Sequence, residues 1–219
     1  MINQVFKSVG RITQAVWTAL LVTALVALTL ERFSLAFVSL ATLVLSIAPV
    51  ILARRLSLHL PIPFVLATTA FLIASLVLGE TFNFYNRFWW WDLALHGSAA
   101  IGFGLVGYLF VLMLFEGDPF AAPPSALALI AFCIAMTLGA LWEVFEFSVD
   151  IAFGLNMQKS GLNDTMGDLI VNAIGAFIAS LAGYFYSRFE QVGIFGKAID
   201  QFVRLNKIYF RKAVRRLRR

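Results

Sequence analysis

Six long apolar stretches divide this chain, and a short polar or proline-containing break separates each from the next. Each stretch approaches the ~20 residues that an α-helix needs to cross the hydrocarbon core of a bilayer. Hydrophobic residues make up 61% of the sequence and charged residues only 13%, which excludes an ordinary soluble domain. The sequence therefore predicts an all-α fold, a polytopic membrane protein built as a bundle of six transmembrane helices. We expect these helices at residues 15–30, 33–53, 62–79, 92–115, 125–147 and 166–186.

The C-terminal tail is basic and amphipathic. Between residues 199 and 217, apolar residues recur at helical spacing while basic residues fill most other positions. Such a helix lies along a membrane surface, where each basic residue near anionic lipid contributes about 1 kcal/mol. We therefore expect a six-span transmembrane domain at 1–186 and a cytoplasmic tail at 187–219 that binds anionic lipid of the inner leaflet. No base-stacking or recognition motif accompanies the charge, so nucleic acid is not an expected partner.

The distribution of lysine and arginine predicts the orientation of the spans. With six spans, one side of the membrane holds Lys7, Arg11, Arg54, Arg55 and the ten basic residues of the segment 188–219. The other side holds only Arg32, Arg87 and Lys159. By the positive-inside rule, both termini are cytoplasmic in a bacterial cytoplasmic (inner) membrane. The start of the fourth span, the end of the fifth and the start of the sixth then all face outward.

Three polar clusters lie at these outward-facing ends. Acidic residues at bilayer depth cost roughly 2.5 to 3.5 kcal/mol each, so a group of them indicates partners such as a metal, protons or a polar cavity. Residues three or four apart share one face of a helix. On that basis the fifth span presents Glu143, Glu146 and Asp150 together, the fourth presents Asp92 and His96, and the sixth presents Asp164, Asp168 and Asn172.

If the last three spans are neighbours, these eight side chains converge on one pocket that is open to the outside. So many carboxylates cannot all remain ionised in one place without a cation, and we therefore expect a bound divalent metal ion. Oxygen-rich ligation with one imidazole suits magnesium, manganese, calcium, iron or zinc. A bundle di-iron site usually has a Glu-x-x-His pair on each of two helices, whereas the fifth span here has Glu-x-x-Glu, which disfavours di-iron oxidation.

Each of these residues also has a purely structural interpretation. His96 alone is typical of a hydrogen-bonded packing histidine, and Asp92 and Asp164 can cap helix N-termini. Asp150 can simply be solvated. Glu143 and Asp168 are harder to explain in this way, because both lie within apolar helix and face another polar residue.

The sequence resembles the YjdF-like family of bacterial inner-membrane proteins of unknown function. The matching features are Trp91-Asp92 with Leu95-His96, Trp142-Glu143-x-x-Glu146, and Asp164-Thr165-x-x-Asp168-Leu169-x-x-Asn172-x-x-Gly175-Ala176. The same order is similar, more distantly, to the VanZ-like proteins, which tend to carry glutamine where this chain has Glu146. VanZ itself is associated with glycopeptide-antibiotic resistance, so the resemblance implies a role in the cell envelope.

Three functional hypotheses follow. In the leading one, the protein is a metal-dependent hydrolase acting on a lipid or lipid-linked envelope substrate: Asp92, His96, Asp164 and Asp168 hold the metal, while Glu143 or Glu146 is the general base. In the second, the acidic stripe is the ion pathway of a small proton- or cation-coupled transporter, for which a homo-oligomer can supply the missing repeat. In the third, the protein is a non-catalytic scaffold with a structural cation site.

Overall fold

The computed structural model describes residues 9–115, 122–189 and 193–210, and every regular element in these segments is a helix. Six of the helices are long and apolar enough to cross a membrane, which confirms the predicted all-α, six-span class. The chain divides into two compact units, Met1–Trp91 and Asp92–Arg219. Large hydrophobic side chains remain exposed along the long helices of both units, as expected for surfaces that face lipid.

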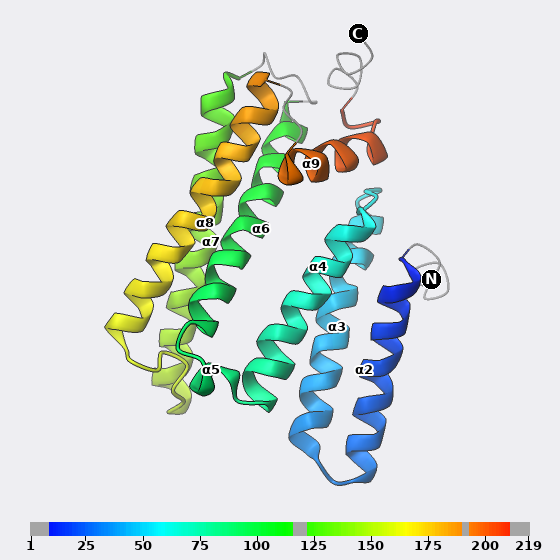
Figure 1. Ribbon diagram of the computed structural model, residues 1–219, viewed down its shortest axis with the longest axis vertical. Helices are drawn as coiled ribbons and strands as arrows, with labels where there is room; N and C mark the ends of the chain where they lie inside the picture. The colour runs from blue at the N-terminus through cyan, green and yellow to red at the C-terminus, as the bar shows by residue number, and fades with distance from the viewer. Residues whose placement is uncertain (1–8, 116–121, 190–192, 211–219) are drawn as a thin grey trace. The chain divides into compact units, whose positions relative to one another are not determined.

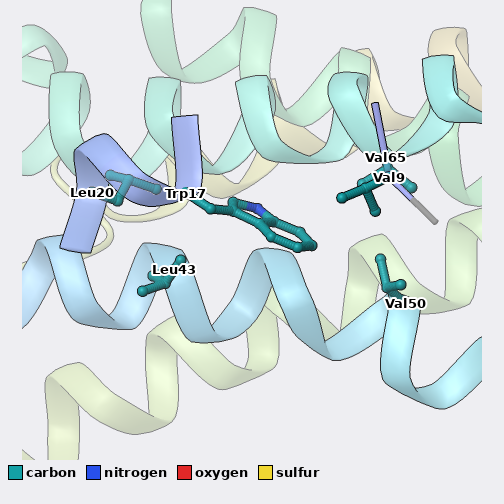
Figure 2. Packing of buried hydrophobic residues seen from close by; sticks show 6 residues of the cluster. All are labelled: Val9, Trp17, Leu20, Leu43, Val50 and Val65. Atoms are coloured by element: carbon teal, nitrogen blue, oxygen red, sulfur yellow. The ribbon is translucent and has the colours of Figure 1, made fainter. Parts of the chain in front are cut away.

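The first unit contains α2 (Arg11–Thr29), α3 (Phe33–Arg55), α4 (Ile62–Leu72), the π-helix η1 (Ile73–Thr81) and the short α5 (Phe84–Arg87) (Figure 1). A tight turn joins α2 to α3, and Glu31 adopts a positive φ of 55° in it. Trp17 is 1% exposed and lies between α2 and α3 in the core of this unit (Figure 2). The other buried members of this core are Val9, Leu20, Leu43, Val50 and Val65.

The third predicted span is not a uniform α-helix. It begins at Ile62 as α4 and continues from Ile73 to Thr81 as η1. A π-helix has a wider turn than an α-helix, and such segments are rare and often functional. Here the Ser75 and Tyr85 hydroxyl oxygens lie 2.9 Å apart in a hydrogen bond, and the Tyr85 ring covers Gly79 so closely that a Cβ there would collide with it.

The second unit contains α6 (Trp91–Leu114), α7 (Pro124–Phe153), α8 (Leu162–Phe189) and α9 (Ile194–Leu205) (Figure 1). Gly154, at φ 65°, ends α7 in the left-handed conformation that glycine adopts without strain. Both α7 and α8 are longer than the 125–147 and 166–186 expected from the sequence, and the connection between them is correspondingly short.

Small residues let α6 and α8 pack closely. A Cβ added to Gly104 would lie 2.5 Å from the Ala179 Cβ, and a Cβ added to Gly175 would collide with the backbone oxygen of Gly97. Gly183 is covered in the same way by the ring of Tyr108. The α6 and α8 backbones are therefore held together at a point directly beside His96.

The tail helix α9 is amphipathic, as predicted, but it ends at Leu205 rather than continuing through the tail. Its apolar residues Ile199, Phe202 and Val203 are buried, and Arg204 pairs with Asp200 at 2.6 Å (Nε to Oδ2). The basic residues of the segment 211–219 lie outside the described residues. Lipid binding by the tail stays a prediction, and so does the 1–186 and 187–219 division.

Candidate metal centre

Three helices of the second unit carry the predicted site residues. Asp92 lies in the first turn of α6 and Asp164 in the first turn of α8, where free backbone N–H groups and the helix dipole favour a carboxylate. His96 and Asp168 follow one turn further along the same two helices. The third helix, α7, contributes Glu143 and Glu146, both of which are buried. Their first-turn positions thus explain why Asp92 and Asp164 are tolerated. The other four groups, His96, Glu143, Glu146 and Asp168, need another explanation.

The inner part of the site consists of His96, Glu143 and Asp168. All three are buried, and each offers one ligand atom such that these atoms lie within 4.8 Å of one another. The His96 Nδ1 atom is 3.4 Å from Oε1 of Glu143, and its Nε2 atom is 3.9 Å from Oδ2 of Asp168. We refer to these three residues as the inner donor set.

The outer part of the site consists of Asp92, Asp164 and Asp168, whose ligand atoms also lie within 4.8 Å of one another. Asp92 and Asp164 are half-buried, so this outer donor set is nearer to solvent than the inner one. Oδ1 of Asp92 lies 3.6 Å from Nε2 of His96, which connects the two sets. The Lys159 ammonium donates a hydrogen bond of 2.7 Å to the other oxygen, Oδ2 of Asp92.

Several buried polar atoms at the site have no conventional hydrogen-bond partner within the described parts of the chain. These atoms are Oε1 and Oε2 of Glu143, Oδ1 of Asp168 and Nδ2 of Asn172. The side chain of Thr165 lies near the Glu143 carboxylate and interacts with it. Glu143 is only 4% exposed and Asp168 only 1% exposed, so neither carboxylate is solvated by bulk water. A buried charged or polar group without a partner is costly, and these carboxylates belong to groups of residues that could hold a metal ion.

The spacing of the donor atoms fits a metal ion. Two ligands at about 2.1 Å from a tetrahedral ion lie about 3.4 Å apart, and those on opposite sides of an octahedral ion about 4.2 Å apart. The separations of 3.6 and 3.9 Å from Nε2 of His96 to Asp92 and Asp168 fall in this range, as does the 3.4 Å from Nδ1 to Glu143 for an ion on the other side of the ring, and all three exceed normal hydrogen-bond lengths. Carboxylate oxygens with one imidazole nitrogen suit manganese, magnesium, iron or zinc. The donor set therefore has both the chemistry and the spacing for a divalent cation.

The remaining three predicted residues have other contacts. Glu146 is buried beside Glu143 and accepts a 2.8 Å hydrogen bond from Nε1 of Trp142. Asp150 is outside both donor sets, and its oxygens accept hydrogen bonds of 2.7 and 2.9 Å from the backbone N–H groups of Met157 and Gln158. Asp150 thus orders the connection that follows α7. This role differs from the two that the sequence suggested, a pocket residue or a solvated side chain.

Asn172 lies one turn beyond Asp168 and is 2% exposed. Its side chain packs against Gly139 of α7, where an added Cβ would lie 2.7 Å from Nδ2. Asn172 therefore fills the space between α7 and α8 below the donor sets.

Sequence reasoning missed two contacts. Lys159 was counted only as an outward-facing cation, yet it pairs with Asp92 of another helix. Trp142 was part of a motif without a role, yet it orients Glu146. Helical spacing was a usable signal for Trp142, because it precedes Glu146 by four residues. No spacing rule connects Lys159 to Asp92, 67 residues away, although Lys159 is the sole basic residue in the α7–α8 connection.

A family described as "Predicted membrane protein (DUF2238)" matches residues 13–189, which include all eight predicted site residues. The chain belongs to this family. An uncharacterized protein from Thermotoga maritima is 35% identical over 102 residues, which cover 46% of this chain and 51% of that relative. The alignment thus spans about half of the relative's length. No solved structure matches the chain.

Proposed function

We propose that this protein is a metal-dependent hydrolase that acts on a lipid or lipid-linked substrate at the outer face of the bacterial cytoplasmic membrane. The observation that carries the proposal is the convergence of His96, Glu143 and Asp168, three buried donors from three helices, with Oδ1 of Asp168 left without a hydrogen-bond partner among the described residues. A site built only for packing would have satisfied these atoms or replaced them with apolar groups.

The geometry favours a specific division of roles. Glu143 belongs to the inner donor set, so it is better suited to holding the ion than to transferring protons. Glu146 is the better general base, because it is one turn away from Glu143 and the Trp142 indole N–H fixes one of its oxygens. A divalent ion in this site supplies Lewis acidity and an acidified water molecule.

Lys159 and the half-buried Asp92 and Asp164 lie on the more exposed side of the site. A cationic side chain there suits an anionic headgroup, such as the phosphate of a phospholipid or a polyprenyl diphosphate. In the proposed reaction, a water oxygen attacks phosphorus and Glu146 accepts the water proton. The phosphorus–oxygen bond to the leaving group breaks, and that group departs as an alcohol or phosphate after protonation.

The test uses the full-length protein, purified, stripped of metal with EDTA, and reconstituted in phosphatidylethanolamine–phosphatidylglycerol vesicles that contain phosphatidic acid or a polyprenyl diphosphate. Phosphate release is measured with and without Mn²⁺, and bound metal by elemental analysis. We expect Mn²⁺-dependent turnover in the wild type and in the control Glu80→Gln, an exposed glutamate in the other unit. Asp168→Asn should lose both metal and turnover, whereas Glu146→Gln should keep metal and lose at least about 100-fold in rate.

Two results would overturn the proposal. Wild-type protein without stoichiometric metal would remove its basis. Metal binding without turnover on either lipid would exclude the hydrolase role and favour the alternatives, cation-coupled transport or a structural cation in a scaffold.

A further inference from the structure

The two donor sets overlap in a single residue, Asp168. In the inner set Asp168 is grouped with His96 and Glu143, and in the outer set it is grouped with Asp92 and Asp164. One compact ion cannot use all five residues equally, because two sets of three donors, each spread over up to 4.8 Å, surround two adjacent positions rather than one.

Asp168 has the geometry of a shared ligand. Its Oδ2 atom lies 3.9 Å from Nε2 of His96. Its Oδ1 atom is buried and has no hydrogen-bond partner within residues 9–115, 122–189 and 193–210, in a side chain that is 1% exposed. A carboxylate that belongs to both donor sets and binds through both of its oxygens can hold two ions about 3.5 to 4 Å apart, the separation found in two-metal sites.

His96 connects the same two positions. Its Nδ1 atom faces Glu143 at 3.4 Å, and its Nε2 atom faces Asp92 at 3.6 Å. A neutral imidazole coordinates an ion through one nitrogen and donates its other N–H to a neighbouring carboxylate. Either tautomer therefore links one ion to a carboxylate of the other set.

The charge balance also favours two ions. Five carboxylates of the second unit lie close enough to one another to interact electrostatically: Asp92, Glu143, Glu146, Asp164 and Asp168. Lys159, on Asp92, is the cation paired with them in the described residues. One divalent ion together with Lys159 leaves two negative charges uncompensated, whereas two divalent ions and Lys159 neutralise all five.

We propose that the cluster is a two-cation centre in which Asp168 bridges an inner ion, held with His96 and Glu143, and an outer ion, held with Asp92 and Asp164. This inference rests on the metal site of the proposed function and deepens it. The Lys159 ammonium competes for Asp92, so the outer ion binds more weakly than the inner one. Two bridged ions are the arrangement that stabilises both the attacking and the leaving oxygen in phosphoryl transfer.

The experiment is a Mn²⁺ titration of the metal-stripped full-length protein in detergent, followed by elemental analysis and electron paramagnetic resonance. Wild type and Glu80→Gln should bind two Mn²⁺ per chain and give the spectrum of a spin-coupled pair at saturation. Asp164→Asn, a change at a half-buried position that folding tolerates more easily, should retain one Mn²⁺ with an uncoupled spectrum. Lys159→Met should bind the second Mn²⁺ at least several-fold more tightly.

The failures of the two proposals are distinguishable. Saturation of the wild type at one Mn²⁺ would overturn the two-cation centre and leave the metal-dependent function standing, whereas no bound Mn²⁺ would overturn both. Two Mn²⁺ ions without spin coupling, or two ions still bound in Asp168→Asn, would refute the bridge.

Discussion

Replacing Glu143 with glutamine should stabilise the metal-free protein and remove most of the stabilisation that metal gives. The change keeps the shape of the side chain and removes a carboxylate that is 4% exposed and has no conventional hydrogen-bond partner in the described segments. The inner donor atoms lie within 4.8 Å of one another. At that distance and an effective dielectric constant of about 20, two full negative charges repel each other by about 3.5 kcal/mol, and proton uptake makes this an upper bound. Without metal, the Glu143→Gln protein should therefore be more stable than the wild type.

Metal should offset most of this difference by stabilising the wild type. A ligand at 100 times its dissociation constant stabilises the folded state by about 2.7 kcal/mol, which corresponds to about 5 to 10 °C in unfolding temperature for a chain of this size. We expect the wild type to gain this increment with Mn²⁺ and Glu143→Gln to gain little of it. Thermal unfolding in detergent, followed by near-UV circular dichroism with EDTA and with Mn²⁺, measures both. The control Glu80→Gln should behave as wild type. A Glu143→Gln protein that is less stable than wild type in EDTA would refute the reasoning, because Glu143 would then be satisfied without a cation.

Three further predictions concern packing, catalysis and orientation. Gly175→Ala should lower the free energy of unfolding by about 1 to 3 kcal/mol and weaken Mn²⁺ binding, because the added Cβ pushes α6 away from α8. Thermal unfolding and metal analysis measure both effects, and Gly102→Ala, with nothing within 4 Å of its Cβ, is the matched control. Trp142→Phe should lower kcat about tenfold with metal content unchanged, since it removes the N–H donor that fixes the proposed base, and an unchanged kcat would contradict that role. A cysteine at Asn156 should react with a membrane-impermeant maleimide in intact cells, whereas one at Ser57 should react only after permeabilisation; the reverse pattern would invert the proposed topology.

The number and class of the helices could be predicted because apolar length alone specifies a membrane-spanning helix. The ends were less accurate where a polar residue interrupts apolar sequence. The fifth span was expected to end at residue 147, yet α7 continues to Phe153, and Asp150 in its last turns accepts hydrogen bonds from the following connection. The π-helical segment Ile73–Thr81 carried no recognisable signal, since its composition is that of an ordinary apolar helix.

The candidate site was predictable to the level of helix faces. Spacing of three or four residues predicted that Asp92 shares a helix face with His96 and Asp164 with Asp168, and the structure brings the members of each pair close together. Which carboxylate faces which nitrogen depends on how far each helix is rotated, and that rotation is set by contacts such as Gly175 against Gly97. Helical spacing carries no information on this rotation, so the grouping of Glu143 with the ligands emerged only from the packed structure.

The position of the two donor sets along their helices determines how a substrate can reach them. His96 is five residues beyond the start of α6 and Asp168 six residues beyond the start of α8, so both lie about 8 to 9 Å along their helices. The 24 and 28 residues of these helices span about 36 and 42 Å, more than the ~30 Å of hydrocarbon, so part of each helix extends beyond the hydrocarbon. If the protruding part is the first turns, as the proposed function requires, a phospholipid would present its phosphate to the donor sets while its acyl chains stay among those of the neighbouring lipids. The proposed reaction would then need no extraction of the lipid, and its water would come from the adjoining aqueous phase.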